Sequence, residues 1–424
     1  MKIFFQTHGC STNFSESEVM MGLLAKAGFE LGTIEESEAV VVNVCTVKGE
    51  GTAFREIKEI KEKYPHKKLV VAGCLTPKLI RGIRGIDENA GLISTHNIDK
   101  IVEVVENTVH NTPIEAISES RLKKISMPKL RRNPVIGIVP ILSGCNHNCT
   151  YCSVKLIKGN VDSYPIEEIL SEVRKAVAHG CKEIWVTSQD NAAYMMEHGK
   201  SELANLLNQI LAVSGDFKVR LGMMNPINAG GIIDELIAVY KHEKMFKFFH
   251  LPVQSGNDEI LKKMNRNYTV NEFKEIVRKI KGQIPNLTLS TDIIVGFPGE
   301  TEEQFNDSLE LIKDITPDVL NISRFQAREG TAAALIEGQV SGGIAKERSR
   351  KLTDLFSRIA YMQNEKWYDW KGLVLIDEKG KDNTWIGRNF AYKPVIVAGD
   401  YMLGQIIKVK INRITSIDLR GEIV

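Results

Sequence analysis

Short β-branched runs alternate with helical patterns along most of the chain, and this alternation constrains the fold more than any other feature. Near the start, strand-like runs occupy 2–7, 39–43 and 68–72, and helical patterns occupy 16–27 and 53–63. Strands separated by helices pair in parallel, with helices covering the sheet. The sequence therefore predicts an α/β domain over residues 1–117, a three-layer fold around a parallel sheet.

A second series of the same alternation fills residues 135–364. Its strand-like runs are 135–142, 183–187, 218–222, 246–251, 287–295 and 319–325. Six βα units fit a parallel barrel, closed or partial. We therefore predict a central (β/α)6 partial TIM-like barrel. The segment between the two domains, 118–134, is predicted to be a linker with a basic face, carrying Arg121, Lys123, Lys124, Lys129, Arg131 and Arg132.

The last sixty residues, 365–424, change character. They hold short strand-like runs at 373–376, 384–387, 394–397, 405–411 and 418–423, separated by Gly- and Asp-containing turns. This pattern predicts a small antiparallel β-barrel of OB-like size. Basic residues (Lys408, Lys410, Arg413) and aromatic ones (Trp385, Phe390, Tyr392) give it the mix that binds RNA. The alternative is a solvated strand face over core aromatics.

Composition excludes several classes. Hydrophobic residues make up 43% and charged residues 25% of the 424, and the net charge of +2 gives no global argument for a polyanionic partner. No stretch approaches the roughly 18–20 apolar residues of a membrane span, so we expect a cytoplasmic protein without membrane association. Seven cysteines, absent after Cys181, do not resemble a secreted disulfide framework. Metal or redox chemistry explains them better.

Cys145, Cys149 and Cys152 follow a predicted barrel strand with C-x-x-x-C-x-x-C spacing. Three thiolates hold three irons of a 4Fe-4S cluster and leave the fourth open. S-adenosylmethionine (SAM) can chelate that iron through its amino and carboxylate groups. One electron then cleaves the sulfonium of SAM to give a 5′-deoxyadenosyl radical. Tyr151 can pack beside the cofactor. The alternatives are a zinc site or unrelated thiols.

Cys10, Cys45 and Cys74 each come directly after one of the three N-terminal strand-like runs. The carboxyl ends of parallel strands share one edge of the sheet, so the three thiols can converge on one site. They could hold a second 4Fe-4S cluster, again with one iron open. The alternative is three buried core cysteines, the reading we adopt for Cys181.

At this point the chain resembles the methylthiotransferase family, over essentially its whole length. The motifs that carry the resemblance are THGCSTN at 7–13 with Ser17 and Glu18, GCNHNCTYC at 144–152, LPVQSG at 251–256 with MNR at 264–266, and TDIIVGFPGET at 291–301. The family combines an N-terminal three-cysteine domain, a radical SAM barrel and a C-terminal TRAM domain. The resemblance implies two 4Fe-4S clusters, and a radical that removes hydrogen from carbon while the N-terminal cluster delivers a methylated sulfur.

Polar residues at or near barrel strand ends are candidates for SAM binding. They are Ser188, Gln189, Asn225, Gln254, Ser255 and Asp292. Each has an alternative role in loop capping or in a buried hydrogen bond. Lys158 stands where the wider family commonly has arginine before glycine, which keeps the charge but loses the bidentate geometry.

Family members modify a prenylated tRNA adenosine, a threonylcarbamoylated tRNA adenosine or an aspartate of a ribosomal protein. The mildly basic β-domain favours tRNA, and His8 with the run 188–194 resembles the threonylcarbamoyladenosine branch. We therefore expect methylthiolation of carbon 2 of N6-threonylcarbamoyladenosine in the tRNA anticodon stem-loop. We also expect a monomer served by an unidentified low-potential electron donor. The non-enzymatic alternative is an RNA-binding iron–sulfur carrier.

Overall fold

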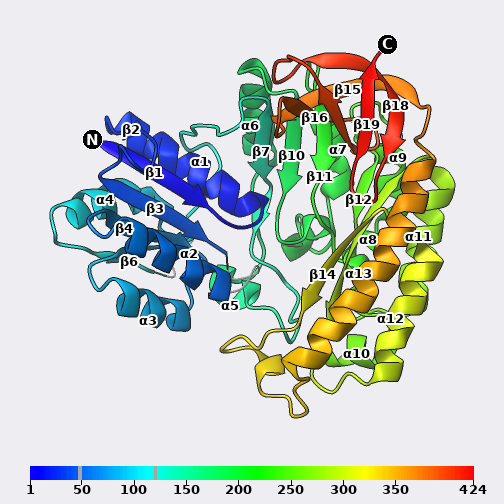
Figure 1. Ribbon diagram of the computed structural model, residues 1–424, viewed down its shortest axis with the longest axis horizontal. Coiled ribbons are helices and arrows are strands. Elements are labelled where there is room, and N and C mark those ends of the chain that lie inside the picture. The colour runs from blue at the N-terminus through cyan, green and yellow to red at the C-terminus, as the bar shows by residue number, and fades with distance from the viewer. Residues whose placement is uncertain (46–49, 119–121) are drawn as a thin grey trace. The chain divides into compact units, whose positions relative to one another are not determined.

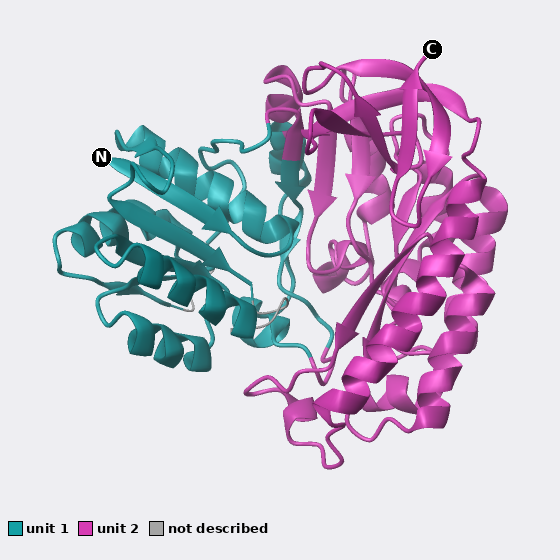
Figure 2. Ribbon diagram, viewed as in Figure 1, with its two compact units in different colours: residues 1–133, 138–147, 152–172 teal, residues 134–137, 148–151, 173–424 magenta. Residues whose placement is uncertain are grey.

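The computed structural model describes residues 1–45, 50–118 and 122–424. The chain forms two compact units (Figure 2): unit 1 contains residues 1–133, 138–147 and 152–172, and unit 2 contains 134–137, 148–151 and 173–424. Within the described ranges, no helix is both long and apolar enough to cross a membrane. The boundaries predicted from sequence at 117, 134 and 364 remain predictions.

Unit 1 is built on a sheet with strand order β2-β1-β3-β4-β5-β6, in which every neighbouring pair is parallel (Figure 1). The strands are β1 (Lys2–Thr7), β2 (Glu30–Leu31), β3 (Ala39–Val44), β4 (Lys68–Gly73), β5 (Gly91–Ser94) and β6 (Glu115–Ala116). The helices are α1 (Ser11–Lys26), α2 (Glu50–Lys63), α3 (Pro77–Ile86), the 3-10 turn η2 (Ile98–Lys100), α4 (Ile101–Val109) and α5 (Val154–Lys158), with a ribbon of β8 (Leu142–Ser143) and β9 (Asp162–Ser163).

Two hydrophobic cores flank this sheet. Successive side chains of β3 point to opposite faces, so Val41 packs with α1 and α4 on one side. Val40 and Val42 pack with α2 and α3 on the other. Every residue of β3 is buried, as expected for a parallel strand covered on both faces. The predicted three-layer α/β arrangement is confirmed.

The central strands run in the order β11-β10-β7 in one sheet and β12-β13-β14 in another. They are β7 (Ile136–Pro140), β10 (Glu183–Thr187), β11 (Lys218–Leu221), β12 (Phe248–His250), β13 (Thr288–Val295) and β14 (Val319–Arg324). A parallel bridge between Val219 and Met245 continues the series from β11 towards β12. In the described residues β7 and β14 do not pair, so the series is open and the predicted partial barrel is confirmed.

Helices cover the outside of these strands (Figure 1). They are α6 (Ile166–Ala178), α7 (Leu203–Leu211), α8 (Pro226–Gly230), α9 (Ile233–Tyr240), α10 (Asp258–Lys263), α11 (Val270–Gln283), α12 (Glu302–Ile315) and α13 (Gly342–Glu365), with 3-10 turns η3 (Asn191–Ala193), η4 (Met196–His198) and η5 (Ala332–Ala334). Capping boxes begin α11 at Thr269 and α12 at Thr301, which satisfies backbone N–H groups that lack helical partners.

The C-terminal strands close into a barrel in the order β15-β16-β17-β19-β18. They are β15 (Lys371–Lys379), β16 (Thr384–Arg388), β17 (Pro394–Ala398), β18 (Ile406–Ile414) and β19 (Leu419–Ile423). The small barrel is confirmed, but it is not wholly antiparallel, because β17 pairs with β19 in parallel. A closed ring with an odd number of strands cannot alternate direction throughout, so one neighbouring pair must be parallel.

Candidate functional site

The structure brings Cys10, Cys45 and Cys74 together at the carboxyl edge of the unit 1 sheet. Cys10 follows β1 and caps α1, while Cys45 and Cys74 follow β3 and β4. A hydrogen bond with the Cys45 thiol raises the pKa of Cys10 and lowers the pKa of Cys74. All seven cysteines lie in the described ranges, and none forms a disulfide. The prediction that these three thiols converge at one edge of the sheet is therefore confirmed.

Two glycines allow the cysteine-bearing strand ends to lie close together. A Cβ on Gly9 would lie 2.7 Å from the Cβ of Cys45, and one on Gly73 would lie 2.4 Å from the carbonyl oxygen of Val44. Both glycines have positive φ, +149° and +107°, a region that side chains disfavour. Only glycine fits either place without moving the cysteine-bearing loops.

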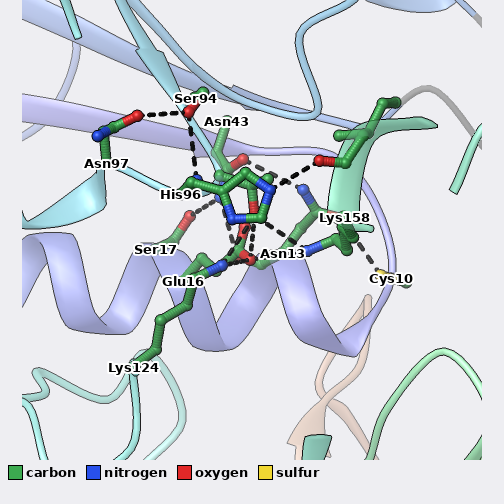
Figure 3. Close-up of polar contacts among 12 residues, drawn as sticks. Cys10, Asn13, Glu16, Ser17, Asn43, Ser94, His96, Asn97, Lys124 and Lys158 are labelled. Atoms are coloured by element: carbon green, nitrogen blue, oxygen red, sulfur yellow. Dashed lines mark hydrogen bonds and ion pairs between the residues drawn. The ribbon is translucent and has the colours of Figure 1, made fainter. Parts of the chain in front are cut away.

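Buried amides fix the spacing between α1 and β3 (Figure 3). Asn13 Nδ2 donates to the Val44 carbonyl oxygen over 3.0 Å, and Asn43 Nδ2 donates to Ser17 Oγ over 2.9 Å. The Cys10 thiol donates to Asn13 Oδ1 over 3.2 Å. Sequence reasoning placed Asn13 and Ser17 in a motif but gave them no role.

A buried ion group lies next to these amides in unit 1 and consists of Glu16, Lys124 and Lys158 (Figure 3). Glu16 Oε1 accepts from Lys124 Nζ over 2.5 Å and from Lys158 Nζ over 2.9 Å. The hydroxyl of Thr95 also donates to Glu16 Oε1, over 2.6 Å. The three charged side chains are 2%, 7% and 4% exposed, respectively.

Burial alone would raise the pKa of Glu16, but the two lysines outweigh burial and lower this pKa to about 2. Burial lowers the pKa of Lys124 to about 8 despite Glu16. For Lys158, burial is outweighed by Glu16 and the nearby thiols, so its pKa is raised. Sequence reasoning noted Lys158 as a substitution and Lys124 as part of a basic run, and it missed that both reach Glu16.

Two lysines of the predicted basic linker do not contribute to an exposed basic face. Lys124 is buried against Glu16, and Lys129 pairs with Glu172 at 2.8 Å, where both side chains are at most 5% exposed. The guanidinium of Arg132 lies 5.2 Å from the centre of the Phe14 ring. Burying a lysine requires a partner, and carboxylates of unit 1 provide it. Arg121 lies outside the described residues.

In the second cysteine group, Cys145 and Cys152 belong to unit 1 and Cys149 belongs to unit 2. All three are partly exposed. Cys149 Sγ accepts from Arg266 Nη1 over 3.4 Å, and Arg266 Nη2 donates to the Pro252 carbonyl over 3.0 Å. Burial would lower the pKa of Arg266, but Tyr151, Tyr268 and Cys149 raise it. Arg266 is therefore a fixed cation in direct contact with the sulfur of Cys149. Sequence reasoning quoted Arg266 in a motif without this role.

Tyr151 packs its ring against the apolar cluster of Ile260, Met264, Phe297 and Ala333. Its carbonyl accepts from Arg328 Nη1 over 3.3 Å, and the neighbouring Thr150 carbonyl accepts from the Ala333 N–H over 2.8 Å. Tyr151 therefore anchors residues 148–151 within unit 2.

Some SAM-site candidates have structural roles. Asn225 caps α8 by accepting from the Ile227 N–H, and its own N–H donates to Asp190 Oδ1 over 2.9 Å. The Ser255 hydroxyl accepts from the Asn257 N–H. Gln254 adopts a left-handed φ of +80°, and its N–H donates to the Asp292 carbonyl. For Asn225 and Ser255, the capping alternative describes the contacts seen.

Ser188 and Asp292 are better placed to meet a ligand. The hydroxyl of Ser188 is buried and has no hydrogen-bond partner among the described residues, a situation that buried polar groups usually avoid. Asp292 Oδ1 accepts from Asn321 Nδ2 over 2.6 Å and lies 2.9 Å from His250 Nε2. Gln189 sits beside Ser188 at the end of β10. The residues present thus fit a polar cofactor such as SAM.

In the described ranges, no group of three or more His, Cys, Asp or Glu side chains is arranged around a single metal ion. A 4Fe-4S core places each thiolate on a different iron and not on one shared ion.

Of the aromatic residues proposed for RNA stacking, Tyr392 is buried, whereas Trp385 and Phe390 are partly exposed. Tyr392 is buried, and its hydroxyl donates to Glu183 over 2.7 Å. Phe390 packs on Trp367 and Trp370, and Trp385 joins the same core. These rings bury apolar area inside the small barrel and against the central strands. Lys408 and Arg413 are exposed, and Lys410 pairs with Asp369 at 3.0 Å.

Comparison with known proteins now bears on this arrangement. Residues 139–312 match the "Radical SAM superfamily", residues 2–92 "Uncharacterized protein family UPF0004" and residues 373–424 the "TRAM domain". A protein of Pyrococcus abyssi named "Probable threonylcarbamoyladenosine tRNA methylthiotransferase" is 41% identical, across 100% of this chain and 99% of that protein. The chain belongs to the threonylcarbamoyladenosine tRNA methylthiotransferase family. It is a sulfur-transferring radical SAM enzyme.

Other members of this family extend the likeness. The "Threonylcarbamoyladenosine tRNA methylthiotransferase" of Drosophila melanogaster is 36% identical, across 100% of this chain and 77% of that protein. Among solved structures, the radical SAM methyltransferase TsrM from Kitasatospora setae aligns with a TM-score of 0.53 at 14% identity, over 76% of this chain and 74% of that one. The latter likeness concerns the fold. Radical SAM membership implies SAM and a 4Fe-4S cluster as cofactors.

Proposed function

We propose that this chain adds a methylthio group to carbon 2 of N6-threonylcarbamoyladenosine, next to the anticodon of a tRNA. The observation that carries the sulfur-transfer step is the convergence of Cys10, Cys45 and Cys74 at one sheet edge. A radical SAM reaction alone needs only one set of three cysteines. The family relatives support the choice of substrate.

In this proposal, Cys145, Cys149 and Cys152 hold one 4Fe-4S cluster, and Cys10, Cys45 and Cys74 hold a second. When bound, these groups together with SAM supply a 5′-deoxyadenosyl radical and a methylated sulfur. Each set of three thiols leaves one iron open, for SAM at the first cluster and for sulfur at the second.

Residues of unit 2 orient the SAM-binding end. Arg266 fixes Cys149 through a charge-assisted bond to its sulfur. The unsatisfied hydroxyl of Ser188 is available to a polar group of SAM, with Gln189 beside it. Asp292, within β13, is held by His250 and Asn321 and offers a carboxylate as a further polar group.

The TRAM barrel is the part we assign to tRNA. Strand β18 of this barrel carries Lys408 and Lys410, which face away from a core formed by Ile407, Val409 and Ile411. Lysines on such a surface bind phosphates and make affinity dependent on salt. The electron donor and a monomeric state remain predictions.

Nucleoside mass spectrometry of tRNA from a deletion strain tests the substrate. We expect loss of the 2-methylthio derivative and accumulation of N6-threonylcarbamoyladenosine, restored by the wild-type gene and not by Cys149→Ala. An unchanged level of the methylthio nucleoside would reject this substrate. A mass change in a prenylated adenosine, or in a ribosomal protein, would support one of the other two reactions of the family.

A separate measurement distinguishes an enzyme from an iron–sulfur carrier. Anaerobically reconstituted protein is mixed with SAM and dithionite, and 5′-deoxyadenosine is quantified by chromatography. The enzyme should release it, whereas a carrier would leave SAM intact.

A further inference from the structure

The buried ion group of Glu16, Lys124 and Lys158 carries more positive than negative charge. Both lysines contact the same carboxylate oxygen, at 2.5 and 2.9 Å, and both also donate to Thr95 Oγ1, at 2.8 and 3.0 Å. Two ammonium groups and one carboxylate leave a surplus of one positive charge. Because all three side chains are more than nine-tenths buried, water cannot neutralise that surplus.

A buried surplus charge is costly unless an anion lies nearby. Cys10 stands at the start of α1, the helix that also carries Glu16. Lys158 interacts electrostatically with the thiols of both Cys10 and Cys74. The partner that this ion group lacks is therefore expected at the cysteine site.

We propose that the buried ion group is a built-in counter-charge for the iron–sulfur cluster at Cys10, Cys45 and Cys74, and that Lys158 sets the reduction potential of this cluster. The inference rests on the proposed second cluster. An oxidised 4Fe-4S core held by three thiolates has one net negative charge, which equals the surplus in the protein. Lys158 acts on the cluster electrostatically, through the cysteines that hold it, and we therefore call it a positioning residue and not a catalytic one.

The origin of the charge in the sequence gives the arrangement a further consequence. Lys158 ends α5, in the segment that directly follows Cys152, whereas Glu16 belongs to the N-terminal sheet domain. The stretch that begins at the SAM-binding cysteines therefore delivers a charge to the other cysteine site. The electrostatics of the second cluster then depend on how this stretch is folded.

The test uses the full-length protein with Cys145, Cys149 and Cys152 all changed to alanine, so that only the cluster at the N-terminal cysteines can form. Iron content and a redox titration followed by electron paramagnetic resonance give its occupancy and midpoint potential. Lys158→Met should shift the potential to more negative values, because an added electron loses a nearby cation. Lys158→Arg keeps the charge and should hold the potential close to that of the parent protein.

Glu16→Gln supplies the opposite change. It removes the carboxylate, leaves both lysines and should shift the potential to more positive values. A merely structural role would not give shifts of opposite sign. Lys123→Met, which removes an exposed lysine next to Lys124, is the matched control and should shift nothing.

Two failures can be told apart. If the parent triple variant binds no iron–sulfur cluster, the second cluster of the proposed function is rejected, and this inference with it. If the parent binds a cluster whose potential is unchanged by Lys158→Met, or moves the same way with Lys158→Met and Glu16→Gln, only the counter-charge role is overturned.

Discussion

The two cysteine regions are held by different kinds of interaction. In unit 1, the strand-end thiols lie beside a buried ion group and a set of paired amides, all from elements far apart in the sequence. In unit 2, Cys149 meets a single buried cation, Arg266, and the neighbouring loop is fixed by backbone bonds. The first region therefore contributes to the folding stability of unit 1. The second keeps side chains such as Ser188 unsatisfied, as a binding site for a ligand must.

The largest expected effect separates the two regions by chemistry. Cys149→Ala should abolish SAM cleavage, because one iron ligand of the SAM-binding cluster is lost. Cys45→Ala should leave cleavage largely intact and abolish methylthiolation of tRNA. Assays of 5′-deoxyadenosine and of modified nucleoside check both, with Cys181→Ala as the control that should behave as wild type. Loss of SAM cleavage in both variants would contradict the division.

Stability should distinguish the regions next. Glu16→Gln leaves two buried lysines facing each other and should lower the free energy of unfolding of the apoprotein by about 3–5 kcal/mol at pH 7. The exposed Glu30→Gln in β2 is the control and should change little. Urea unfolding followed by circular dichroism measures both. Equal, small losses would mean that the ion group does not support unit 1.

The same group predicts a pH dependence. The folded pKa of Glu16, about 2, lies below its ordinary value of 4.5, so its contribution is complete above pH 4.5 and is lost as the pH falls towards 2. The loss is on the order of 3 kcal/mol. Urea unfolding of the wild type between pH 5 and 3 should show this slope, and Glu16→Gln should flatten it. If the variant showed the same slope, groups other than Glu16 would account for the loss of stability in acid.

A smaller effect is expected from Arg266. Arg266→Gln removes the cation beside Cys149 and should slow SAM cleavage about tenfold, corresponding to the roughly 1.5 kcal/mol of a charge-assisted bond. Arg278→Gln changes an exposed arginine of α11 and should have no effect. Single-turnover 5′-deoxyadenosine formation is the measurement. If Arg266→Gln cleaves SAM at the wild-type rate, the cation does not serve this cluster.

The smallest effect concerns lysines and RNA. The double variant Lys408→Ala, Lys410→Ala should weaken tRNA binding several-fold and reduce the salt slope by about one to two units. Lys123→Ala, in the segment first predicted to be a basic linker, should matter less, because Lys124 and Lys129 of the same segment are paired with buried carboxylates and do not add to a basic surface there. Filter binding over a range of salt concentrations compares them. If Lys123→Ala weakened tRNA binding more than the double variant does, the RNA contacts would lie in the segment 118–134.

Sequence reasoning succeeded for features that local patterns set and failed for features that depend on distant parts of the chain. The positions of Cys10, Cys45 and Cys74 could be inferred because alternating strands and helices force parallel pairing, and parallel strands end at one edge. The closed C-terminal barrel likewise followed from local strand and turn patterns. Its parallel β17–β19 pair did not, since that pair is imposed by ring closure.

The sequence by itself determined the fold class, the family and the two sets of cysteines, because each is encoded in local periodicity or short motifs. Only the tertiary structure decided which charges are buried. Glu16 meets Lys124 across 108 positions and Lys158 across 142, and Tyr392 meets Glu183 across 209. The cost of burying a charge or a hydroxyl depends on the partner that folding brings to it. That partner turned residues that read as RNA contacts into parts of the protein interior.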